Sequence, residues 1–175
     1  MKTKQMALDA MLMAMCAVLG YLSVDLGNIK ITFESVPIIM AALLFGAADG
    51  FAVGALGTLI YQLLRYGISV TTPLWMLPYA LCGLLMGRYA ERRSFALSPK
   101  QLMFIIIANE LLITVLNTGV MYVDSKIYGY YSFVYIFGTV IIRFVICIVK
   151  AAVYAVLIPK LIRSIREHAA GKSGG

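Results

Sequence analysis

The chain alternates long apolar segments with short polar ones, and this pattern predicts helices that cross a membrane. Most of the apolar segments approach the roughly 20 residues that a helix needs to span a lipid bilayer. The second segment is shorter, because Pro37 bounds it on one side and the turn-like run 46–50 on the other. We therefore predict an all-α membrane protein, a compact bundle of six transmembrane helices. The expected spans are 6–21, 36–45, 51–66, 73–87, 102–123 and 133–158.

Basic residues lie mainly on one side of this six-span arrangement. Ten lysines and arginines fall in the two terminal segments and in the loop 88–100, whereas the other side receives Lys30, Arg65 and Lys126. Basic residues accumulate on the cytoplasmic side of membranes, so both the N- and C-termini are expected in the cytoplasm. The outer loops are then 23–35, 67–72 and 124–132. The first of these alternates apolar and polar residues, which predicts a short extended segment.

The composition supports the membrane assignment and limits the number of domains. Hydrophobic residues make up 62% of the chain and charged residues 13%, and the mean hydropathy is +0.90. An average soluble domain has about a quarter charged residues. Six spans use roughly 120 residues, so we expect one membrane domain, 1–166, followed by a polar C-terminal tail, 167–175. The net charge of +7 follows from the basic cytoplasmic side, so a nucleic-acid partner is not expected.

The cysteines and the histidine form no pattern typical of a metal site or a catalytic site. Cys16, Cys82 and Cys147 lie in three different spans, and the only histidine, His168, lies in the tail. The sequence also contains no phosphate-binding loop and no hydrolase motif. We therefore expect no metal, no cofactor and no catalytic residues. ATP-driven transport would require another subunit.

Two ionisable residues are expected near the middle of the membrane, where a charge is costly and commonly functional. Glu110 lies about 13 Å into the fifth span and Arg143 about 15 Å into the sixth, at 1.5 Å per residue. Polar residues follow both at helical spacing, so these faces are expected to line a shared interior. Two interpretations remain open: a structural ion pair between Glu110 and Arg143, and a cavity in which Arg143 and Lys150 meet an anionic ligand. The candidate ligand-binding residues are Gln62, Arg65, Trp75, Tyr79, Glu110, Asn117, Arg143 and Lys150.

The first predicted helix carries a ridge of small residues. Ala7, Ala10, Ala14 and Ala17 follow one another at intervals of three or four residues, so they lie along one face. In lipid, small side chains allow two helices to approach closely. This alanine ridge therefore either packs inside the bundle or binds a partner protein within the membrane.

Several segments, in their order along the chain, resemble the substrate-binding S components of energy-coupling factor (ECF) vitamin transporters. The resemblance covers 6–166 and includes the alanine-rich first helix. The segments that carry it are AMLMA at 10–14, ITFESVPII at 31–39, LLFG at 43–46, DGFAVG at 49–54 and TTPLWMLPYA at 71–80.

This resemblance implies a function, partners and a location. It implies that the bundle binds a water-soluble vitamin near the outer side of the membrane, beneath the outer loops. It also implies a membrane coupling subunit, two cytosolic ATPase subunits and a multi-pass location in the bacterial plasma membrane. Ala10 and Ala14 would contact the coupling subunit. Folate is the expected vitamin, because the pattern looks closest to folate-type S components and the cavity is expected to be basic; pantothenate and pyridoxine-like vitamins are the alternatives.

Two other functions stay open on the sequence. One is a non-transporting scaffold of the cell-wall elongation machinery, since the rod-shape protein MreD is similar in size and in number of spans. The other is a small autonomous permease, although the chain lacks the internal repeat that is usual in many such transporters. Charges near the membrane midplane favour a binding protein, because a scaffold has no need of them.

Overall fold

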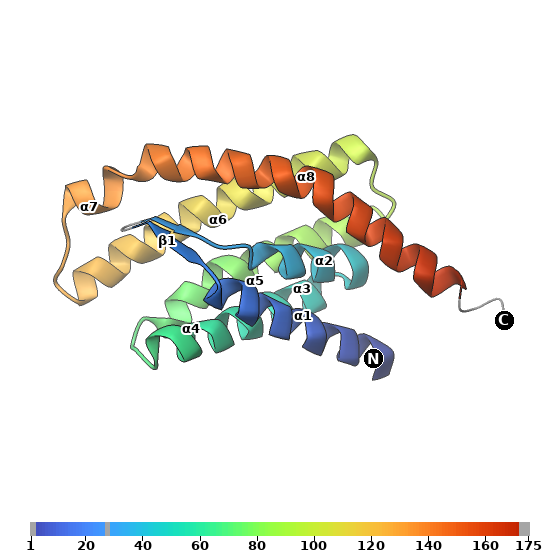
Figure 1. Ribbon diagram of the computed structural model, residues 1–175, viewed down its shortest axis with the longest axis horizontal. Helices are drawn as coiled ribbons and strands as arrows, with labels where there is room; N and C mark the ends of the chain where they lie inside the picture. Colours follow the sequence, from blue (N-terminus) through green and yellow to red (C-terminus); the bar gives the residue numbers. More distant parts are fainter. Residues whose placement is uncertain (1–2, 27–28, 172–175) are drawn as a thin grey trace.

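The computed structural model describes residues 3–26 and 29–171, which form a bundle of helices (Figure 1). Among these residues, the helices form six successive segments, two of which are divided into shorter elements, and a short β-hairpin follows the first segment. The first helix is α1 (Thr3–Tyr21), and the hairpin pairs β1 (Val24–Leu26) with β2 (Ile29–Ile31) in antiparallel register. The remaining elements are α2 (Ser35–Phe45), α3 (Ala47–Ala52), the π-helical turn η1 (Val53–Gly57), α4 (Thr58–Tyr66), α5 (Thr72–Arg92), α6 (Pro99–Ile127), α7 (Phe133–Phe137) and α8 (Val140–Gly171).

The prediction of an all-α bundle of six helices is confirmed, with differences in detail. Elements α3, η1 and α4 form one continuous third helix, whereas the sixth predicted span is interrupted at Gly138 and Thr139, between α7 and α8. Helix α8 continues to Gly171, past the predicted start of the tail. Within the described residues, three helices are long and apolar enough to cross a membrane: Ala47–Tyr66, Pro99–Ile127 and Phe133–Ile165.

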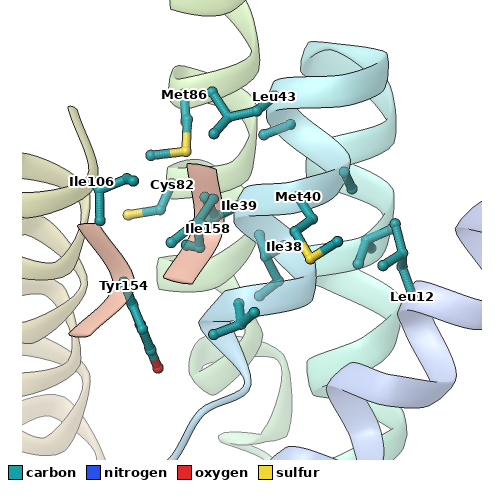
Figure 2. Close-up of a cluster of buried hydrophobic side chains, with 14 of the residues drawn as sticks. Leu12, Ile38, Ile39, Met40, Leu43, Cys82, Met86, Ile106, Tyr154 and Ile158 are labelled. Atoms are coloured by element: carbon teal, nitrogen blue, oxygen red, sulfur yellow. The ribbon is translucent and has the colours of Figure 1, made fainter. Parts of the chain in front are cut away.

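The short second helix forms the centre of the bundle. With 11 residues, α2 is about 16 Å long, roughly half the thickness of a bilayer core. It packs against α1, α3, α5 and α8, and a helix that is buried on every side is apolar all round. Figure 2 shows Ile38 and Ile39 of α2 among Leu12, Met86 and Ile158 from the surrounding helices. Burial among neighbours explains why a span this short is stable.

Glycines set the distance between the third helix and α5. A Cβ atom placed on Gly83 would lie 2.2 Å from the carbonyl oxygen of Gly50, and one on Gly87 would lie 2.5 Å from the backbone of Ala47. The two backbones therefore touch directly, which small residues permit in membrane bundles. This contact fixes α4 and α5 relative to each other, and both helices contribute to the cavity described below.

The two ends of the bundle differ in what they carry. The start of α1 and the end of α8 lie at the same end, and the hairpin and α7 lie at the opposite end (Figure 1). This arrangement agrees with an even number of spans. The assignment of the terminal end to the cytoplasm stays a prediction.

Candidate functional site

A cavity of about 590 Å³ lies between the helices. Its walls include residues from all three predicted outer loops: Thr32 from the first, Ser69 and Thr71 from the second, and Tyr128 and Tyr130 from the third. Typical small-molecule sites enclose about 300–1,000 Å³. The cavity is thus large enough for a ligand of vitamin size.

Six of the eight residues predicted to bind a ligand line this cavity, and two do not. Arg65 at the end of α4 donates a hydrogen bond of 2.7 Å to the backbone carbonyl of Tyr21, at the end of α1. Glu110 lies behind the cavity wall, where its carboxylate faces Lys150. The six that line the cavity are Gln62, Trp75, Tyr79, Asn117, Arg143 and Lys150.

The buried ion pair of the cavity differs from the one considered above. Glu110 Oε2 lies 3.1 Å from Lys150 Nζ, and their side chains are 2% and 16% exposed. The suggested pairing of Glu110 with Arg143 is therefore wrong. Arg143 instead donates to Met121 Sδ at 2.9 Å.

The antiparallel packing of α6 and α8 explains the change of partner. Lys150 follows Arg143 by two turns on α8, or about 10 Å, and Met121 follows Glu110 by three turns on α6. Because the helices run in opposite directions, Glu110 is level with Lys150, and the long side chain of Arg143 reaches Met121 about one turn further along α6. Estimating depth from the predicted ends of the spans misjudged this register.

Asn117 presents an acceptor to the cavity. Its Nδ2 atom donates to the hydroxyl of Tyr79 at 3.2 Å. Its Oδ1 atom is buried and has no hydrogen-bond partner within the described part of the chain. A buried polar atom without a partner is costly, so this oxygen is suited to a ligand N–H group.

Two acidic residues of the cavity wall were not among the predicted site residues. Glu34, 2% exposed, accepts a hydrogen bond of 3.2 Å from Thr32, and Asp124 is 7% exposed. With Arg143 and Lys150, they give the described part of the wall two residues of each sign, so the expectation of a basic cavity is wrong. A carboxylate at the start of the apolar segment 36–45 was the available signal for Glu34.

Asp124 organises the part of the wall formed by α5, α6 and the following loop. It accepts hydrogen bonds from the indole Nε1 of Trp75 at 3.3 Å and from the hydroxyl of Tyr130. The ring of Tyr130 lies 5.8 Å from that of Tyr135 in an edge-to-face arrangement. Burial and the adjacent Asp124 raise the pKa of Tyr130 above its ordinary value. The aromatic side chains lining the cavity are Tyr61, Tyr66, Trp75, Tyr79, Tyr128, Tyr130 and Tyr135.

Comparison with known proteins identifies the family. The chain matches the family described as "ECF transporter, substrate-specific component" over residues 4–162. It belongs to this family. The protein is thus an S component, a membrane subunit of a transporter. The match favours this assignment over a cell-wall scaffold or an autonomous permease. A search of curated proteins found no match.

A solved structure shares the fold of this S component. It is the crystal structure of FolT bound with folic acid, which superposes with a TM-score of 0.67 over 87% of this chain and 90% of the FolT chain. The two sequences are 19% identical. The similarity covers nearly the whole bundle and supports the fold.

The alanine ridge of the S component lies mostly outside the bundle. Ala7, Ala10 and Ala14 are exposed, whereas Ala17 is buried and belongs to the packed face of α1. That packed face also holds Leu12, and α1 contacts α2, η1 and α4 through it. Internal packing therefore does not account for Ala7, Ala10 and Ala14.

Among the described residues, no group of three or more histidine, cysteine, aspartate or glutamate side chains could hold a metal ion.

Proposed function

We propose that this S component binds folate in the cavity between α4, α5, α6 and α8. The observation that carries the proposal is the cavity itself: about 590 Å³, with seven aromatic side chains and charges of both signs in its wall. Aromatic rings suit a flat heterocycle, and a few placed polar groups fix its orientation. The family assignment supports a transported substrate, and the FolT fold, solved with folic acid, makes folate the first candidate.

The proposed binding site comprises the six predicted residues that line the cavity, with Glu110 supporting Lys150. Arg143 and Lys150 supply N–H donors, and Asn117 supplies both a donor and an acceptor. Gln62, Trp75 and Tyr79 complete the wall. Arg65 is removed from the binding set because it contacts Tyr21 at the end of α1.

Trp75 provides a direct test of the proposed substrate. It is the only tryptophan of the chain and it lines the cavity. Folic acid, pantothenate and pyridoxine are added in turn to the purified protein, and tryptophan fluorescence is recorded. We expect saturable quenching by folic acid, and Trp75→Phe serves as the control that removes the signal. If only pantothenate or pyridoxine gives saturable quenching, folate is the wrong vitamin; a lack of response to every vitamin in folded protein contradicts a vitamin-binding function.

We further propose that the exposed alanine ridge binds a membrane coupling subunit, which two cytosolic ATPase subunits drive. The assembled transporter would lie in the bacterial plasma membrane. Ala10 and Ala14 are exposed on α1 and offer a smooth surface to a second helix. Ala17 is assigned to internal packing, because only 6% of its surface is exposed.

Bulky substitutions on α1 test the partner. Ala10→Trp is expected to leave folding and folate binding intact and to abolish uptake when coupling and ATPase subunits are co-expressed. Met11→Trp is the matched control, since Met11 is 63% exposed and is not part of the ridge. Normal uptake with Ala10→Trp would rule out docking through this ridge.

A further inference from the structure

Lys150 and Asn117 both line the cavity, and each has hydrogen-bonding capacity left for a ligand. Lys150 directs one of its three donors to Glu110, and Asn117 Oδ1 is an unused acceptor among the described residues. Glu110 and Asn117 are seven residues apart on α6, or about 10 Å. A ring that carries both an acceptor and a donor can therefore bridge Lys150 and Asn117.

Glu110 determines what Lys150 can bind. Its carboxylate already neutralises the ammonium group at 3.1 Å. A ligand carboxylate at Lys150 would stand close to the buried carboxylate of Glu110, and the two like charges would repel each other. A neutral ring carbonyl accepts a hydrogen bond from Lys150 without this repulsion.

We propose that Glu110 is a specificity-determining residue, an inference that rests on the proposed binding of folate. Glu110 admits, beside Lys150, a neutral ring that carries both hydrogen-bond donors and an acceptor, and it rejects carboxylates. Folic acid offers such a ring, the 2-amino-4-oxopteridine, whose N–H groups suit Asn117 and whose carbonyl suits Lys150. Its p-aminobenzoyl-glutamate portion carries the carboxylates. Glu110 acts through Lys150, so it is a positioning residue and not a direct ligand contact.

Competition by the two halves of the vitamin tests this inference. Tritium-labelled folic acid is bound to the purified protein and displaced with pterin or with p-aminobenzoyl-glutamate. We expect pterin to compete at a concentration at least about tenfold lower. In Glu110→Gln the charge of Lys150 is no longer neutralised, so p-aminobenzoyl-glutamate should gain at least about tenfold relative to pterin. Glu110→Asp, which keeps the charge, and Glu91→Gln, whose carboxylate instead contacts Ala47 N, should keep the wild-type ratio.

The outcomes separate this inference from the proposed function. If labelled folic acid binds but both fragments displace it equally, or if Glu110→Gln leaves their ratio unchanged, the inference is wrong and folate binding stands. Absence of saturable folic acid binding refutes the proposed substrate itself. Should Glu110→Gln fail to fold, Asn117→Leu decides: selective loss of pterin competition by about tenfold supports the inference, and equal loss of both fragments contradicts it.

Discussion

Replacing Lys150 with methionine removes the cation that neutralises Glu110 inside the bundle. The two charged atoms are 3.1 Å apart, and Glu110 is 2% exposed. At an effective dielectric constant of about 20, unit charges at this distance interact by about 5 kcal/mol. Breaking a buried pair by removing one partner typically costs about 3–5 kcal/mol. We therefore expect Lys150→Met to lower the free energy of unfolding by about 3–5 kcal/mol.

The double variant Glu110→Gln/Lys150→Met separates the charge from the packing. Neutral residues of similar volume can replace a buried ion pair at little cost, so we expect the double variant to unfold within about 1 kcal/mol of the wild type. Unfolding by sodium dodecyl sulfate, followed through Trp75 fluorescence, measures each free energy. Lys100→Met, at an exposed position, is the control and should change stability by less than about 0.5 kcal/mol. A double variant as unstable as Lys150→Met would refute the assignment of the loss to an uncompensated charge.

Three further predictions concern packing, the end of α1 and orientation. Gly83→Val should destabilise the bundle by about 1–3 kcal/mol or more, because the added atoms collide with the Gly50 backbone; unchanged stability in the same unfolding assay would contradict the direct contact of α3 with α5. Arg65→Met should lower stability by about 1 kcal/mol through loss of the hydrogen bond to Tyr21 and leave folate affinity unchanged, so a large loss of affinity by fluorescence titration would return Arg65 to the binding site. With the predicted orientation, a cysteine at exposed Ser132 should react with a membrane-impermeant maleimide in intact cells and one at exposed Ser94 only after permeabilisation; the reverse pattern would invert the topology.

The sequence predicts the bundle well because long apolar segments have few alternatives in a membrane. Six helices follow from their lengths, and even α2, too short to span a bilayer alone, is visible as the apolar run 36–45 that ends at Gly46. The break at Gly138 could not be read from the apolar pattern, since the segment 133–158 is largely apolar on both sides of it. Hydrophobicity locates a span but carries little information on a local interruption of its helix.

The candidate site is only partly predictable, since it depends on the register between helices. Helical spacing correctly placed Asn117, Arg143 and Lys150 on faces that line a cavity. The predicted partner of Glu110 was wrong, because the choice between Arg143 and Lys150 depends on how far α8 is shifted along its axis relative to α6. The role of Asp124 could not be predicted from the sequence, because it depends on how the third outer loop folds to bring the hydroxyl of Tyr130 to its carboxylate.

Calorimetric titration of folic acid into the purified S component, without ATP or any other subunit, measures directly whether this cavity binds folate. We expect saturable binding of one folic acid per chain in the wild type, and loss of that binding in Thr114→Trp, which fills the cavity from α6. Met11→Trp, on the exposed face of α1, should bind as the wild type does. Absence of binding to folded wild-type protein, or unchanged binding in a folded Thr114→Trp variant, would contradict the assignment of this cavity to folate.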